Sequence, residues 1–358
     1  MTMPTPDPSN PVPNFVVDDA AKRIESDAGV RSPDGSEASK KRLPKQVRLA
    51  IRYGVGLLIL AAVSRQGWRT WAKWQAQGDL FEISYLPMLG SLLAYLIGLV
   101  FFGIYYGVIV RGVKPATAMI PCVRAYLYSH PAKYVPGKAM VVVVRVGVLG
   151  KADVGPAAAS FTAIFETLSM MAIGGLLGGV LLILPEGHLM GAAVSFGLGT
   201  AFFCTVLPWT FGRAVRLLKK GLPAIDPADC PRPSKADTGK LAALGVGGWL
   251  AWGVSGVLTV SALSGGALRP LAEWPRIAGA VMVGTAGGFA LPILPGGLGL
   301  REGIYHEVTK GVLGPDLAIA SALALRFVWV VGEVIAVAAI SLISDGMPNQ
   351  VSKNELSP

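Results

Sequence analysis

Charged side chains are scarce in this sequence. Only 15% of the 358 residues are Asp, Glu, Lys or Arg, whereas soluble domains carry roughly 25%. Four stretches contain no charge at all: 83–110, 189–212, 241–268 and 277–300. Each reaches the roughly 20 apolar residues that a helix needs to cross a bilayer. The sequence therefore predicts an all-α integral membrane protein rather than a soluble globular one.

Cysteine and histidine are also rare, which removes the most familiar metal, redox and nucleophilic chemistries. The three cysteines show neither metal-site spacing nor a disulfide framework: Cys122, Cys204 and Cys230. The three histidines lie outside any HExxH zinc motif, and each is expected to be an isolated, exposed side chain. No GxSxG nucleophile elbow occurs. The sequence therefore predicts a protein that is not an enzyme and that binds no metal or cofactor.

Basic residues give the chain a formal net charge of +10, but they cluster beside apolar stretches and form no recognisable nucleic-acid module. Seven Lys and Arg residues mark 211–240 as a cytoplasmic loop, whereas PEGH at 185–188 has none and is expected outside. Residues 1–39 lack an apolar signal-peptide core and are typical of a disordered tail. We expect a protein of the cytoplasmic (inner) membrane with both termini inside and no nucleic-acid partner.

The apolar stretches fall within a membrane domain at 40–345, which a short C-terminal tail at 346–358 follows. About six of them are long enough to be full spans: 47–64, 84–110, 157–184, 189–210, 241–263 and 317–343. The first is the weakest, because Arg48 and Arg52 interrupt it. No soluble domain of useful size remains between the spans.

Two further apolar segments are broken by proline and glycine. The first, 115–150, has KYVPGK at its centre, and the second ends in LPGGLGLREG at 294–303. Glycine costs about 1 kcal/mol and proline about 3 kcal/mol inside a helix, so neither segment is one straight helix. The apolar pieces that flank KYVPGK are too short to cross a bilayer. We predict a re-entrant hairpin at each segment; an interfacial loop with snorkelling cations is the alternative.

The two halves of the chain also resemble each other. A shift of 159 positions aligns five pairs: Pro136-Gly137 with Pro295-Gly296, Lys151 with Lys310, Gly155-Pro156 with Gly314-Pro315, Ala159 with Ala318, and Ala163 with Ala322. Coincidence is the alternative, because these residue types are abundant. If both Pro-Gly segments are re-entrant, one hairpin starts from the cytoplasm and the other from outside. The pattern then predicts an inverted-topology repeat, which many secondary transporters use.

Charged residues in and near these segments indicate a polar interior. Irregular backbone is tolerated at membrane depth only where protein or a water-filled cavity satisfies it. Free glycine N–H groups beside Arg301 would suit a phosphate. A charge near the bilayer centre costs at least about 2.5–3.5 kcal/mol, so it usually faces a partner or a cavity. The predicted lipid-headgroup or polar-cavity residues are Lys133, Lys138, Arg145, Glu166, Gly296, Gly297, Arg301, Glu302, Arg326 and Glu333.

These charges allow two interpretations. Arg326 and Glu333 are seven residues apart and so share one helix face. In a lipid pathway, arginines would meet the phosphate, and the glutamates would orient them or meet a headgroup amine. In the structural alternative, Arg326 forms an ion pair between helices with Glu166 or Glu333.

Together these motifs resemble a known family. KYVPGK followed by Arg145, a span with Glu166, then PGGLGLREG and a last span with Arg326 are similar to the lysylphosphatidylglycerol synthase transmembrane region, or flippase-like domain. The resemblance covers roughly residues 45–345. It implies movement of an aminoacylated phospholipid, as expected of relatives fused to an aminoacyl transferase. This chain ends at Pro358 and is expected to lack that transferase, so the substrate does not carry over.

The sequence thus predicts a membrane lipid-binding protein, a flippase-like translocator of a phospholipid or related anionic or zwitterionic lipid. The alternative is a non-transporting membrane scaffold or partner of a separate lipid- or glycolipid-modifying enzyme. An intramembrane transferase is the weakest candidate. The two leading candidates differ in one structural feature. A charged cavity open to lipid favours transport, whereas tightly paired buried charges without a cavity favour the scaffold.

Overall fold

A computed structural model describes residues 83–134, 139–184, 188–221, 226–265, 273–290, 297 and 299–345. Within these ranges the chain forms helices and turns and no strand, as predicted for an all-α protein. The predicted first span at 47–64 and the two tails, 1–39 and 346–358, lie outside the described residues.

Five of the described helices are long and apolar enough to cross a membrane. They are α3 (Tyr85–Val113), α6 (Pro156–Ile183), α7 (Leu189–Val206), α9 (Lys235–Leu263) and α12 (Pro315–Asp345). They correspond to five of the six predicted spans. The chain is therefore a multi-pass membrane protein.

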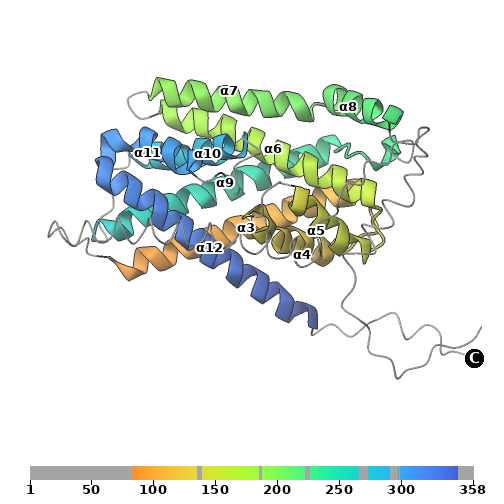
Figure 1. The fold of residues 1–358 in the computed structure, drawn as a ribbon, viewed down its shortest axis with the longest axis horizontal. Helices are drawn as coiled ribbons and strands as arrows, with labels where there is room; N and C mark the ends of the chain where they lie inside the picture. The colour runs from red at the N-terminus through yellow and green to blue at the C-terminus, as the bar shows by residue number, and fades with distance from the viewer. Residues whose placement is uncertain are drawn as a thin grey trace, which may run out of the picture.

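Shorter helices form two hairpins at the Pro-Gly segments. The first contains α4 (Met119–Ser129), the 3-10 turn η1 (Pro131–Tyr134) and α5 (Ala139–Gly150). The second contains α10 (Trp274–Ala290) and α11 (Leu300–Leu313). With a rise of 1.5 Å per residue, each of these helices is shorter than the roughly 30 Å hydrocarbon core. In Figure 1 the hairpins lie toward opposite ends of the long helices, α4 and α5 at one end and α10 and α11 at the other.

The order of elements repeats in the two halves. A long helix, a short hairpin and a second long helix occur as α3, α4–α5, α6 and again as α9, α10–α11, α12. In both halves the helix after the hairpin begins at the proline of a Gly-Pro pair, where a missing N–H costs no hydrogen bond. All four aligned alanines are buried: Ala159, Ala163, Ala318 and Ala322.

The equivalent helices α3 and α9 pack against each other in antiparallel directions. The N–H of Ser84, at the start of α3, donates to the carbonyl of Ala262, at the end of α9, at 2.9 Å. Farther along α3, the Ser91 hydroxyl lies 2.9 Å from that of Ser255. A Cβ on Gly98 would lie 2.3 Å from the Trp252 ring, so only glycine allows this approach. Antiparallel equivalent helices are what an inverted repeat requires.

The segment predicted as the loop 211–240 is largely helical. The preceding span ends at Val206, and α8 (Pro208–Gly221) begins directly after it. Phe211 and Val215 are one helical turn apart and both buried, so they anchor α8 to the protein. Its last turn carries basic side chains. The sequence analysis predicted that this segment is basic. It did not recognise that its apolar residues are spaced as on one face of a helix.

Candidate functional site

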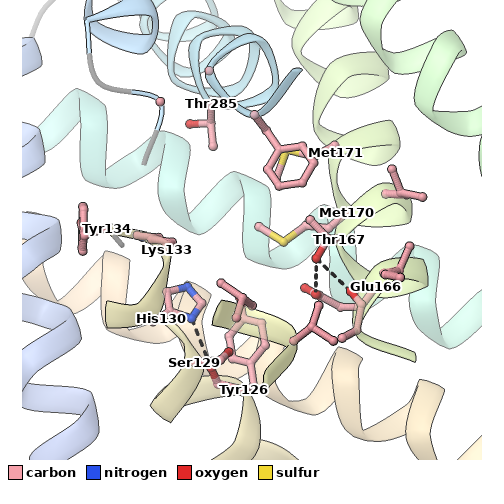
Figure 2. Close-up of a pocket in the computed structure, with 18 of the residues that line it drawn as sticks. Tyr126, Ser129, His130, Lys133, Tyr134, Glu166, Thr167, Met170, Met171 and Thr285 are labelled. Atoms are coloured by element: carbon pink, nitrogen blue, oxygen red, sulfur yellow. Dashed lines mark hydrogen bonds between the residues drawn. The ribbon is translucent and has the colours of Figure 1, made fainter. Parts of the chain in front are cut away.

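A cavity of about 380 Å³ lies where the two hairpins meet α6 and α12. Its wall includes residues from α4, η1, α5, α6, α10, α11 and α12. Figure 2 shows side chains of α4, of η1 and of α6, together with Thr285 from α10, around one space. Ligand pockets commonly enclose about 300–1,000 Å³, so the cavity is large enough for a small molecule or a lipid headgroup.

The first half of the repeat contributes a buried ion pair between α5 and α6. The Arg145 guanidinium lies 2.7 Å from the Glu166 carboxylate, and the two residues are only 2% and 1% exposed. Arg145 also donates to Ser129 at 3.0 Å and lies 4.3 Å from the Tyr106 ring centroid. Thr167 donates to Glu166 at 3.0 Å. The protein thus supplies partners to both charges, which offsets the cost of removing them from water.

The second half contributes the counterpart pair with the charges exchanged. Glu302 on α11 forms an ion pair with Arg326 on α12, whereas in the first half the hairpin carries the arginine and the following helix the glutamate. The prediction that Glu166 or Glu333 is the partner of Arg326 is therefore wrong. The fold of the second hairpin places Glu302 beside α12. The spacing of residues within a single helix could not predict this contact.

For Gly299, Glu302 corrects the expectation that the glycine N–H groups are free for a guest. Its second carboxylate oxygen accepts from the Gly299 N–H at 2.8 Å, which caps α11. The carboxylate therefore occupies the electropositive start of this helix. Gly299 has a φ of +82°, a left-handed conformation that favours glycine.

A third ion pair connects the two halves of the chain. Lys133, from η1 of the first hairpin, pairs with Glu333 on α12. The same carboxylate oxygen accepts from Tyr95 at 2.8 Å and from Tyr134 at 3.5 Å. Its other oxygen is buried and has no hydrogen-bond partner. The α12 helix thus forms an ion pair with each hairpin.

Arg301 differs from the other cavity cations. No carboxylate of the described residues lies within ion-pair distance of it, and its guanidinium stacks 3.8 Å from the Trp329 ring centroid. Gly297 packs closely against α10, since it has a φ of +70° and a Cβ there would lie 3.0 Å from Gly288 Cα. Gly297 and Arg301 both lie on the cavity wall.

The structure brings most of the predicted site residues together. Those on the cavity wall are Lys133, Arg145, Glu166, Gly297, Arg301 and Arg326. Glu302 and Glu333 are not on this wall, but each pairs with a cation that is. Lys138 and Gly296 lie outside the described residues.

The sequence analysis missed several aromatic and polar wall residues. His130 was expected to be isolated and exposed, but it lies on the cavity wall and its ring centroid is 4.6 Å from that of Tyr126. Tyr126, His130 and Lys133 follow one another at helical spacing, four and three residues apart, and Figure 2 shows them on one side of the cavity. This spacing could have indicated from the sequence that the three side chains lie on one face.

The rest of the wall is apolar and reaches the outer surface of the protein. Val142 on α5 and Leu168, Met171 and Phe289 on α6 and α10 line this part. Ile164 also lines the cavity, yet it is 42% exposed. The cavity therefore has a charged region and a largely apolar region, and the apolar region includes Ile164 of α6 at the protein surface.

Comparison with models of known protein families gives no match for this chain, and comparison with curated protein sequences gives none either. The resemblance to the flippase-like domain thus stays a prediction from the motifs.

Proposed function

We propose that this protein binds a membrane lipid by its headgroup in the cavity and moves it across the bilayer. The observation that carries the proposal is the amphipathic cavity of a membrane protein, with cations in one region and a largely apolar region that includes the exposed Ile164. A lipid has the same division between a phosphate-bearing headgroup and acyl chains. Arginine suits phosphate because its planar donors match the phosphate oxygens.

The repeat supports movement rather than binding alone. Transporters with inverted repeats place their substrate site at the interface between the halves and expose it alternately to the two sides. Here both hairpins line one cavity. The exchanged pairs Arg145–Glu166 and Glu302–Arg326 connect each hairpin to the long helix that follows it. In this proposal each hairpin stays attached to its own half while the halves move, and the Lys133–Glu333 pair between the halves has to open.

The family resemblance points in the same direction, since its paired motifs meet at this cavity. We infer a translocator that is not an enzyme and that acts on a phospholipid or related lipid. We place it in the cytoplasmic membrane. The basic α8 and the N-terminus face the cytoplasm in this proposal, because lysine and arginine favour that side.

A second candidate is a scaffold for a lipid-modifying enzyme. One observation favours it: the protein alone satisfies the Arg145–Glu166 pair. Such a pair can hold two helices together without any ligand. The cavity and the uncompensated Arg301 have no role in that interpretation, so transport is the better supported of the two.

The test is translocation of fluorescent lipid in proteoliposomes. An acyl-labelled phospholipid is placed in both leaflets, and an impermeant reducing agent destroys the outer label. We expect the protein to expose the inner label as well, and Arg301→Gln to slow this movement by roughly ten-fold or more. The control is Lys310→Gln, which removes a cation from the surface of the same helix. Equal rates for wild type and protein-free liposomes would support the scaffold.

A further inference from the structure

The charges around the cavity do not balance. Four cations lie on its wall, and three of them each have a carboxylate partner, as described above. Arg301 is the exception. Among the described residues it has no carboxylate partner, and its guanidinium lies 3.8 Å from the Trp329 ring centroid. The described site therefore has one positive charge in excess. A charge in a low-dielectric site favours an opposite charge strongly.

Arg326 supplies a second and independent observation. It is only 5% exposed and lies on the same wall as Arg301. One terminal nitrogen of its guanidinium is bound to Glu302, but the other is buried and has no hydrogen-bond partner. Buried polar groups of folded proteins nearly always have a partner. An anion within reach of both arginines would accept a hydrogen bond from the free Arg326 nitrogen and would also balance the charge of Arg301.

A cationic headgroup would find no free carboxylate among the described residues of the cavity wall. Ammonium groups bind free carboxylates or the faces of aromatic rings. Glu166, the one carboxylate among the described wall residues, already holds Arg145. Three aromatic rings of the wall also lie beside the protein's own cations: Arg301 lies over Trp329, Arg145 over Tyr126, and Arg326 over Tyr134. An amine at any of these three rings would therefore meet like charge.

We propose that the cavity selects a lipid whose headgroup carries one net negative charge and no amine, a phosphodiester such as that of phosphatidylglycerol. Zwitterionic and aminoacylated headgroups are rejected, in contrast to the aminoacylated lipid that the family resemblance implies. The inference rests on the proposed lipid-binding function. A free phosphate has similar charge chemistry, but the apolar part of the wall and the exposure of Ile164 at the protein surface favour a lipid.

The first experiment compares lipids in the proteoliposome assay with wild-type protein. Acyl-labelled phosphatidylglycerol, phosphatidylethanolamine, phosphatidylcholine and lysyl-phosphatidylglycerol are tested under the same conditions. We expect phosphatidylglycerol to move at least roughly ten-fold faster than the other three, a ratio equal to about 1.4 kcal/mol. Soluble glycerophosphate and inorganic phosphate at millimolar concentration should not slow it. Inhibition by either would mean that the cavity takes the free anion, which would overturn the lipid assignment.

Substitution of Arg301 identifies the origin of the selectivity. Arg301→Gln removes the excess charge and should bring phosphatidylglycerol and phosphatidylcholine to within roughly two-fold of each other, whereas Arg301→Lys should keep the preference. Lys310→Gln should change nothing. Equal or faster movement of any of the other three lipids by wild type would overturn the inference and leave the proposed function intact. If folded wild type moves none of the four lipids and native mass spectrometry shows none bound, the proposed function itself fails.

Discussion

Replacement of both members of the Glu302–Arg326 pair separates a structural role from a functional one. Both residues are buried, at 8% and 5% exposed. Removal of one partner from a buried pair costs about 3–5 kcal/mol, because the other charge is left uncompensated. In Arg326→Gln, Glu302 keeps its hydrogen bond from the Gly299 N–H at 2.8 Å. We therefore expect the loss to lie near the lower limit, about 3 kcal/mol.

The double variant Glu302→Gln/Arg326→Gln removes both charges. We expect it to recover most of the stability that Arg326→Gln alone loses. Glutamine at 302 retains an oxygen that can accept from Gly299, so the cap on α11 survives. We expect the double variant to lie within about 1 kcal/mol of wild type, which gives a coupling energy of about 2 kcal/mol or more. For comparison, loss of the exposed Lys310–Glu307 pair should leave the stability nearly unchanged, because water screens the two charges.

The assay is unfolding in detergent or bicelles, with lipid translocation measured on the same preparations. If Arg326 contacts the lipid phosphate, the double variant is stable but still fails to move lipid. Recovery of both stability and full transport in the double variant would refute this reasoning, because the charges would then be only a structural pair. Loss of stability that the double change does not restore would show that the pair is not the relevant interaction.

Three further predictions concern the fold. Cysteine accessibility in intact cells should place 211–240 inside and the PEGH connection between α6 and α7 outside; labelling of 211–240 from the external face would overturn the orientation. Cysteines introduced beside Gly137 and Gly297 should crosslink if the hairpin tips meet; no crosslink with any reagent length would contradict this. Gly175→Ala should lower the unfolding free energy by about 1–3 kcal/mol, because its Cβ would lie 2.6 Å from α7 backbone, whereas Gly197→Ala meets open space and should have no such effect.

Sequence reasoning located the long helices because apolar length alone defines a span. It located the two hairpins because proline and glycine interrupt the helical pattern at two places, and a shift of 159 positions aligns these places. Gly155-Pro156 and Gly314-Pro315 mark the starts of α6 and α12 correctly. These features are local, and local composition determines them.

The partners of the charges were less accessible from sequence. Glu302 and Arg326 are 24 positions apart on different helices, so their contact depends on how the hairpin folds back. Periodicity within α12 suggested Glu333 instead, since it shares a face with Arg326, but Glu333 pairs with Lys133 from the other half of the chain. Aromatic wall residues such as Trp329 carry no charge signal and are common in membrane helices, so only the fold shows that they line the cavity.

The central claim is that the cavity holds the headgroup of a membrane lipid. Structure determination in nanodiscs that contain phosphatidylglycerol tests it most directly. We predict density for a phosphate within hydrogen-bond distance of Arg301 and of the unpaired Arg326 nitrogen, with acyl density leaving along the apolar wall past Ile164. Lipid headgroups confined to the bilayer surface, with the cavity occupied by water or by side chains alone, would contradict the account.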